Sequence, residues 1–343
     1  MKKATLLLLL TFVFSLSFAQ NAENKVNSKG KKEGYWKKYD EKGTLLYEGN
    51  FKNGVPTGTF KYYHSNGKLK STTHFIQGTH KVHTTMFDLN EKISAEGNFF
   101  DQQKDSIWNY YNEKGTLIKS ESYNKGKKHG DWKTYSSQTG LLLEECHYDN
   151  NVLNGERATY FTDGKISTRS NYINGEINGT FESYFPNEVL YYKGSYLHGI
   201  ETGTWEYYDE KSQPRKTLEY KNGKIQKTYL YLNIAGGLQK LNQANIAYFH
   251  KEGTKTRITT NEGKTFLVAQ VFEDLLTYID YVDFCLINPN YAVSYNNIVK
   301  YRSLGTDRIE VTLKPATEEP VICEGDYAKA VMMLFTDEKP KEE

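Results

Sequence analysis

The sequence predicts an all-β dominated fold, with an elongated antiparallel sheet of stacked β-hairpin repeats followed by a small β-rich domain with two short helices. Three observations predict it. One pattern of about 24 residues occurs eight times in succession, Tyr, Phe and Thr are abundant within it, and no apolar period of 3.6 residues accompanies it. Beyond Gly223 the period ends and the character of the sequence changes.

The pattern consists of an opening aromatic residue, a Tyr three residues later, a Gly-x-Leu segment and a closing aromatic residue. The Tyr position reads Tyr39, Tyr63, Phe87, Tyr111, Tyr135, Tyr160, Tyr184 and Tyr208, in steps of 24 residues with a single step of 25. The opening position reads Trp36, Phe60, Thr84, Trp108, Trp132, Arg157, Phe181 and Trp205. The closing position is aromatic in all eight copies, from Phe51 to Tyr220. The third and sixth copies are therefore degenerate at the opening position.

Each copy is predicted to be a β-hairpin. A polar, Gly-containing turn lies in the middle of the copy, as at 40–43, 65–67 and 112–115. In the second half of the first copy, Leu45, Tyr47 and Phe51 are separated by even offsets, so they share one face of a strand. One hairpin cannot bury that face, but a stack of hairpins can, and its stability then comes from neighbouring copies.

The residues 34–225 resemble the MORN repeat. Gly-x-Trp-x-x-Tyr followed by Gly-x-Leu is similar to its motif, and the 24-residue period is similar to its bacterial variant, whose members are often described as antitoxin-type repeats. The resemblance implies an interaction scaffold, since eukaryotic relatives are linked to membranes and protein partners.

The first 19 residues are predicted to be a signal peptide. Lys2 and Lys3 precede an apolar run at 4–19, and small residues stand at the positions before Gln20 that a signal peptidase reads. The 16 residues of this run fall short of the roughly 20 that a membrane-spanning helix needs. We therefore expect an exported chain, in the periplasm, at the cell surface or secreted, without a transmembrane span after cleavage. Residues 20–33 are expected to be a polar linker.

The repeats carry a candidate binding surface but no catalytic motif. Aromatic doublets recur, and because adjacent strand residues point to opposite faces, one member of each doublet should lie on the outer face of the sheet. Such a ladder could bind an extended glycan or peptide by stacking, or could simply cover the sheet. The candidate ligand-binding residues are Tyr62, Tyr110, Tyr160, Tyr184 and Tyr207.

We expect neither an enzyme nor a bound metal or cofactor. His80 and His83 are three residues apart, a spacing that in a strand points the two side chains to opposite faces. The three cysteines Cys146, Cys285 and Cys323 are too scattered for a disulfide framework and are expected to be free thiols.

A compact domain is predicted at 236–335, followed by a charged tail at 336–343. Its expected strands are 244–250, 255–260, 264–267, 283–287, 291–294, 308–313 and 319–323. Phe272, Leu275, Leu276 and Ile279 are spaced as on one face of a helix, which predicts a short helix at 271–280. A second helix should begin near Asp326.

This order of elements resembles a LytTR-type DNA-binding domain. The segment FCLINPNYAVSYNNI, residues 284–298, aligns without a gap on the family motif, and its apolar positions match. The family's Arg, His, Arg and Ser positions are here Leu286, Asn288, Pro289 and Asn290. The resemblance implies that DNA-binding-like positions would be Asn288 and a basic cluster of Lys300, Arg302 and Arg308.

Charge argues against nucleic acid as the partner. The whole chain has a net charge of +2, and residues 238–335 hold ten Lys and Arg against twelve Asp and Glu. The sequence therefore predicts an exported, non-enzymatic binding or scaffold protein whose partner is an unidentified protein or glycan of the cell envelope. The alternative is a LytTR-type DNA-binding transcriptional regulator, which would need a cytoplasmic location.

Overall fold

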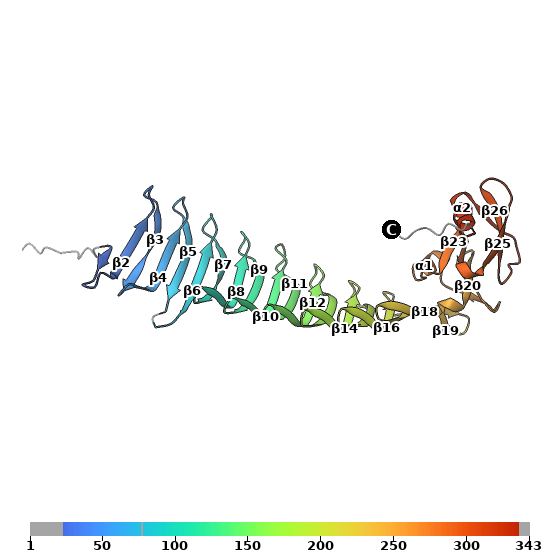
Figure 1. Cartoon of the computed structure of the whole chain (residues 1–343), viewed down its shortest axis with the longest axis horizontal. Coiled ribbons are helices and arrows are strands. Elements are labelled where there is room, and N and C mark those ends of the chain that lie inside the picture. Colours follow the sequence, from blue (N-terminus) through green and yellow to red (C-terminus); the bar gives the residue numbers. More distant parts are fainter. Residues whose placement is uncertain (1–22, 77, 336–343) are drawn as a thin grey trace, which may run out of the picture. The chain divides into compact units, whose positions relative to one another are not determined.

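The computed structural model describes residues 23–76 and 78–335, so the predicted signal peptide and charged tail lie outside the described residues. The chain divides into two compact units, up to Lys127 and from Lys128 onward. Within each unit the repeats form antiparallel hairpins, and two short helices follow in the second (Figure 1). The predicted fold class, mostly β with hairpin repeats and a small β-rich domain, is confirmed.

The strands of the repeats alternate with tight turns. The first unit holds β1 (Lys25–Val26), β2 (Lys32–Tyr39), β3 (Leu45–Lys52), β4 (Val55–Tyr63), β5 (Leu69–Phe75), β6 (Lys81–Phe87), β7 (Ile93–Phe100), β8 (Gln103–Tyr111) and β9 (Leu117–Asn124). There follow β10 (Lys127–Tyr135), β11 (Leu142–Asp149), β12 (Val152–Tyr160), β13 (Ile166–Ile173), β14 (Glu176–Tyr184), β15 (Leu190–Leu197), β16 (Ile200–Tyr208), β17 (Pro214–Lys221), β18 (Lys224–Ile234) and β19 (Gly237–Asn242).

Regular structure begins earlier than the sequence predicts. Within the segment expected to be a linker, β1 pairs with the start of β2, with Lys25 opposite Glu33. The indole Nε1 of Trp36 donates a hydrogen bond of 2.9 Å to the carbonyl of Lys25. This short strand was missed because it has no apolar alternation of its own and is held by the edge of β2.

The opening and closing aromatic residues of each copy lie on one face of its hairpin, which we call the ring face. In the first unit, Phe60 on β4 contacts Phe51 and Phe75 edge-on, with 5.1 Å between ring centroids in both pairs. In the second unit, Trp205 on β16 contacts Tyr196 at 5.1 Å and Tyr220 at 5.9 Å. Phe60 and Trp205 therefore each lie between the closing rings of their own copy and the preceding one, in the edge-to-face geometry that aromatic pairs favour.

Each buried opening ring packs against a glycine on the preceding strand, whose missing side chain makes room for the ring. A Cβ added to Gly49 would lie 2.5 Å from the ring of Phe60, and one added to Gly194 would lie 2.0 Å from that of Trp205. Gly97 stands in the same relation to Trp108, which has no exposed surface. The rings therefore lie flat on bare backbone, which only glycine permits at this distance.

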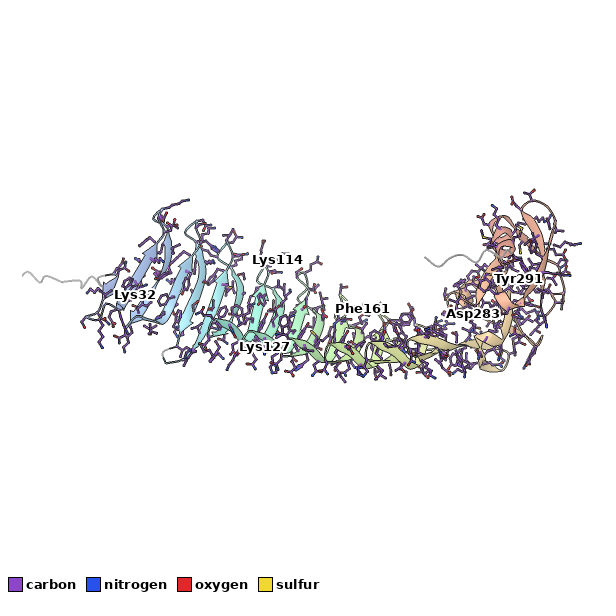
Figure 2. The ribbon with its side chains drawn as sticks, in the orientation of Figure 1. Lys32, Lys114, Lys127, Phe161, Asp283 and Tyr291 are labelled. Carbon is purple, nitrogen blue, oxygen red and sulfur yellow. The ribbon has the colours of Figure 1, made fainter. Side chains whose placement is uncertain are left out.

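The remaining elements form the C-terminal domain. They are η1 (Gln243–Asn245), β20 (Ile246–Glu252), β21 (Lys255–Thr260), β22 (Thr265–Val268), α1 (Phe272–Leu276), β23 (Phe284–Asn288), β24 (Tyr291–Ser294), η2 (Tyr295–Asn297), β25 (Ile298–Ser303), β26 (Arg308–Leu313), β27 (Val321–Glu324) and α2 (Gly325–Met333). A five-stranded sheet has the order β22-β21-β20-β24-β23, and a second sheet has the order β25-β26-β27. Tyr291, labelled in Figure 2, stacks on His250 with ring centroids 4.2 Å apart.

The last long strand of the repeats belongs to the core of this domain. Leu230 and Leu232 of β18 are each 1% exposed and pack in one cluster with Phe249, Phe272 and Phe284. A second core cluster lies between the two sheets and α2. The junction is thus a continuous strand whose apolar side chains the domain needs for its own core.

One predicted helix is shorter in the structure, and strands β19 and β25 were not predicted. The helix expected at 271–280 is α1, which spans only Phe272–Leu276. The hydroxyl of Thr277 donates to the carbonyl of Asp274 at 2.6 Å, and the amide of Asp280 donates to the side chain of Gln243 at 3.0 Å, so both groups bond outside a continued helix. Strand β25 was not predicted, because its exposed positions alternate too weakly. Among the described residues, no helix is long and apolar enough to cross a membrane.

The close approach at the glycine predicts that Gly194→Ala destabilises the fold. An added methyl group would overlap the ring of Trp205, and overpacking of this kind costs about 1–3 kcal/mol in the free energy of unfolding. Urea denaturation would measure the change. The matched control is Gly305→Ala, where an added Cβ meets nothing within 4 Å. Equal stability of the two variants would mean that the glycine is not what admits the ring.

Candidate ligand-binding site on the ring face

The third copy interrupts the ring face of the first unit. Thr84 stands where the neighbouring copies have Phe60 and Trp108, and it is 4% exposed. On the preceding strand, Thr73 stands where those copies have Gly49 and Gly97. The two threonine hydroxyls bond to each other at 3.0 Å, so their polar atoms are satisfied within the sheet.

The backbone of the third copy differs as well. Two residues before the opening position, the second copy has Gly58 with a φ of +70°, and the pairing of β3 with β4 shifts register nearby. The third copy has Val82 there, and a β-branched residue is strained at positive φ. The pairing of β5 with β6 accordingly runs without a shift, from Ser71 opposite Met86 to Phe75 opposite Val82.

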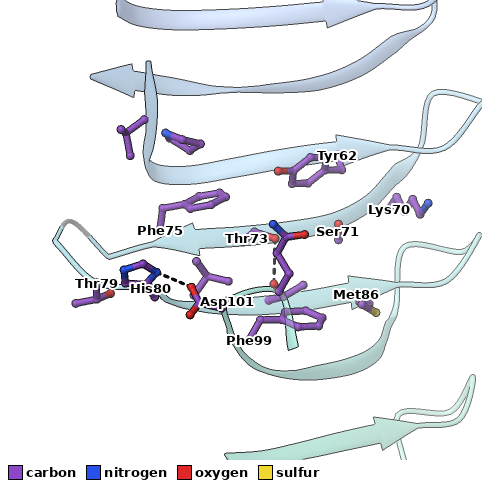
Figure 3. Close-up of a pocket in the computed structure, with 15 residues that line it drawn as sticks. Tyr62, Lys70, Ser71, Thr73, Phe75, Thr79, His80, Met86, Phe99 and Asp101 are labelled. Atoms are coloured by element: carbon purple, nitrogen blue, oxygen red, sulfur yellow. Dashed lines mark hydrogen bonds and ion pairs between the residues drawn. The ribbon is translucent and has the colours of Figure 1, made fainter. Parts of the chain in front are cut away.

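A cavity lies where the opening ring is missing. It has a volume of about 580 Å³ and is lined mainly by apolar groups, among them Tyr62, Phe75, Val82, Met86 and Phe99. Figure 3 shows Phe75 above and Phe99 below the hydroxyl of Thr73, which bonds to that of Thr84. This size falls within the range of roughly 300–1,000 Å³ that is typical of small-ligand pockets.

One hydrogen-bonded pair marks the rim of the cavity. The Nδ1 of His80 lies 2.5 Å from a carboxylate oxygen of Asp101, and both side chains are more than half exposed. In the fourth copy the position of His80 is held by Lys104, whose ammonium lies 5.0 Å from the ring centroid of Trp108. The rim of the third copy can therefore both donate and accept hydrogen bonds, whereas its interior is apolar.

The sixth copy, which is also degenerate, fills the place of its ring differently. Arg157 occupies the opening position, and its Nε lies 2.7 Å from a carboxylate oxygen of Glu144 on the neighbouring strand. A planar guanidinium with a bonded partner thus replaces the aromatic ring. The degenerate copies are consequently not equivalent.

The five tyrosines predicted as a ladder do not occupy equivalent positions. Tyr62, Tyr110 and Tyr207 lie two residues after the opening position and therefore on the ring face, where Tyr62 lies 6.3 Å from Phe60 between ring centroids. Tyr160 and Tyr184 lie three residues after it and point to the opposite face. All five are only partly exposed. The prediction of a single outer ladder is wrong, because the doublets of the sixth and seventh copies begin one residue later in the repeat than those of the other copies.

On the face opposite the rings, tyrosine hydroxyls donate to glutamates. Tyr63 donates to Glu48 at 2.7 Å, and Tyr160 donates to Glu145 at 2.5 Å. Burial, followed by the hydrogen bond to Glu48, raises the pKa of Tyr63 to about 12. The same two causes, with Glu145 as the partner, raise the pKa of Tyr160 to about 12. These tyrosines are thus held neutral as hydrogen-bond donors within the sheet.

Three of the four DNA-binding-like positions, Asn288, Arg302 and Arg308, make contacts within the domain. The side-chain amide of Asn288 donates to the carbonyl of Ile322 at 2.9 Å. Arg302 is paired with Glu310, and the Nε of Arg308 lies 3.0 Å from a carboxylate oxygen of Glu324. Lys300 is exposed on β25. The two arginines are therefore partly neutralised by glutamates on the same small sheet.

Within residues 23–76 and 78–335, no group of three or more His, Cys, Asp or Glu is arranged to hold a metal ion. His80 lies in the turn before β6, and His83 lies on that strand opposite His74. Cys146, Cys285 and Cys323 are free thiols, as expected. Burial raises the pKa of Cys285 to about 11, which disfavours the reactive thiolate.

Comparison with known families supports the repeats. The MORN repeat variant matches residues 32–53, 56–77, 177–198 and 201–222. These segments correspond to the first, second, seventh and eighth copies, so the predicted resemblance is confirmed. No curated protein matches the chain.

Three solved structures are similar to parts of the chain. The LytTr DNA-binding domain of a Bacillus cereus protein is 15% identical over 31% of this chain and 95% of its own, with a TM-score of 0.27. It comes from the family that the C-terminal residues resemble. TarM is 19% identical over 33% of this chain and 19% of its own, with a TM-score of 0.17. A complex of TcdB2, TccC3 and Cdc42 is 10% identical over 80% of this chain and 16% of its own, with a TM-score of 0.18. At these values none of the three indicates a function.

The raised pKa of Tyr63 predicts a loss of stability at alkaline pH. Its folded-state pKa lies above the unfolded value near 10, so its contribution is complete below about pH 10 and is lost as the pH rises toward 12. The free energy of unfolding of the wild type should approach that of Tyr63→Phe across this window. We expect a change of a few tenths to about 1 kcal/mol, because solvent screens a partly exposed group. Urea denaturation at about pH 9 and pH 11 would measure it. A constant difference between the two proteins would contradict the assignment.

The pairing of Arg302 and Arg308 predicts weak, sequence-independent binding of duplex DNA. If all three cations of the cluster bound phosphates, the slope of log affinity against log salt would be about −2.7. Titration of the full chain with random duplexes at about 50 mM and 200 mM salt would measure the slope. Sequence-dependent affinity that persists at the higher salt would instead support a transcriptional regulator.

Proposed function

We propose that this chain is an exported, non-enzymatic binding protein that uses the ring face of its MORN-variant repeats to hold a partner of the bacterial cell envelope. The observation that carries the proposal is the cavity in the third copy. It interrupts a row of packed rings, the surface that lines it is mainly apolar, and hydrogen-bonding groups stand at its rim. A concave apolar surface with a few polar groups is what a binding site requires.

The geometry of the third copy also favours a binding role of the ring face over a purely structural one. If the ring face only stabilised the sheet, we would expect a buried ring in the third copy, as in the neighbouring copies at Phe60 and Trp108. Instead, Thr73 and Thr84 are bonded to each other beneath an open space. The stability that a buried ring would add is absent at this position. A requirement for open space would account for that loss.

Export rests on the sequence. Lys2 and Lys3 precede the apolar run at 4–19, which ends in small residues before Gln20. A partner in the envelope, either a protein or a glycan, follows from that location. The regulator alternative is less well supported, because it needs a cytoplasmic location and unpaired cations, whereas Arg302 and Arg308 are paired with glutamates.

The test of export is the location and the N-terminus of the mature chain. Expressed with its own N-terminus in a Gram-negative bacterium, the chain should accumulate outside the cytoplasm and begin at Gln20. The variant Ala19→Arg should remain at precursor length, because signal peptidase needs a small residue there. A wild-type chain that keeps Met1 and stays in the cytoplasm would overturn export.

The test of binding uses a variant that fills the cavity. The double variant Thr73→Gly/Thr84→Trp, which we call the plugged variant, copies the arrangement of Gly97 and Trp108. Purified wild-type chain should be retained on isolated envelope fractions, and the plugged variant should be released. The matched control is Thr85→Trp, because Thr85 is the next residue of β6 and points to the opposite face. Equal retention of all three proteins would remove the cavity from the proposal.

A further inference from the structure

We infer that the cavity in the third copy is a socket for one aromatic side chain of a partner protein, which would lie between Phe75 and Phe99. This inference rests on the proposed binding function and names its ligand class. The reasoning starts from the complete copies, where an opening ring always has a closing ring beside it. Phe60 has one on each side at 5.1 Å, and Trp205 has them at 5.1 and 5.9 Å.

In the third copy both closing rings are present and the ring between them is missing. Phe75 contacts Phe60 on one side, and Phe99 contacts Trp108 on the other at 4.8 Å. Both Phe75 and Phe99 also line the cavity, so each presents a further part of its surface there. A ring that entered from a partner would meet two aromatic walls, which the repeat geometry places to receive a ring. Edge-to-face contacts of this kind contribute about 0.5–1.5 kcal/mol each beyond burial.

The polar groups of the cavity favour a ring over a sugar. The hydroxyls of Thr73 and Thr84 are bonded to each other, and the two residues are only 9% and 4% exposed, so the floor presents little polar surface to a deeply placed ligand hydroxyl. A sugar that entered edge-on would bury hydroxyls without hydrogen bonds, which is unfavourable. An aromatic side chain buries only carbon there. Its single N–H or O–H could reach the rim, where the carboxylate of Asp101 accepts hydrogen bonds.

The sixth copy shows that loss of the ring does not by itself leave a socket. There the opening position is filled by Arg157, bonded to Glu144. The third copy combines three changes that act together. Val82 removes the register shift, Thr84 shortens the opening side chain, and Thr73 bonds to Thr84 beneath the open space. The site is thus built from coordinated residues of two adjacent strands.

The experiment measures the binding of small aromatic probes to the full chain that begins at Gln20. N-acetyl-tryptophanamide and N-acetyl-tyrosinamide would be titrated while the methyl signals of Val82 and Met86 are followed by NMR. N-acetyl-leucinamide and a chito-oligosaccharide would serve as apolar and glycan comparisons. We expect saturable shifts with the two aromatic probes, at least tenfold weaker binding of the other two, and no saturable shift of the Val82 signal in the plugged variant.

A second variant keeps the inference testable if the plugged variant does not fold. Phe99→Leu retains the apolar volume but removes one aromatic wall. It should weaken binding of the tryptophan probe by about two- to tenfold and leave the leucine probe unchanged, because only the ring-to-ring contact is lost. Thr85→Trp should bind all probes as the wild type does.

The outcomes separate this inference from the proposed function. Equal affinity for the leucine and tryptophan probes, or preference for the oligosaccharide, would overturn the aromatic socket. If such a result accompanied envelope retention that the plugged variant loses, the proposed function would stand and only the ligand class would fail. Saturable binding of the aromatic probes without envelope retention would support the socket and overturn the envelope partner.

Discussion

The packing of the buried rings of Phe60, Trp108 and Trp205 onto the backbone of the preceding strand is the interaction on which the rest of the repeat structure depends. Hairpins alone expose both faces, and the apolar surface that they bury comes from rings such as Phe60, Trp108 and Trp205. Each of these rings needs a glycine beneath it and closing rings beside it, so the residues that support one ring belong to two copies. Stability is therefore shared between neighbours, as in other repeat proteins.

The same constraint explains why a local change can create a site. In the third copy the loss of the ring at Thr84 is accompanied by Thr73 in place of the glycine of the second and fourth copies, and by Val82 in a strand pair without a register shift. The result is a hollow with intact aromatic walls rather than a collapsed strand pair. The sixth copy shows the other solution, in which Arg157 and Glu144 occupy the place of the ring as a bonded pair. The repeated closing rings thus form the walls of the site, and the missing opening ring of the third copy leaves the space between them.

The C-terminal domain separates the requirements of a fold from those of a binding surface. Its core needs Leu230 and Leu232 from the last long strand of the repeats, which makes β18 part of both structures. In contrast, the polar groups of Asn288, Arg302 and Arg308 bond to partners within the domain. Apolar positions can therefore be kept while the surface chemistry changes, since packing and surface chemistry place independent demands on a sequence.

The sequence by itself determined the period, the hairpins, the ring positions and most strands of the C-terminal domain, including 255–260, 291–294 and 308–313 with the bounds that the structure has. These features follow from local rules, because alternation and turn residues act within a few positions. Only the tertiary structure decided which tyrosines share a face, that Gly49, Gly97 and Gly194 admit the rings, and that the third copy is hollow while the sixth is filled. The ladder of Tyr62 and Tyr160 was wrong for the same reason that the cavity could not be foreseen. Both depend on how side chains of adjacent strands fill the space between them, and that contact is set by register and close packing rather than by composition.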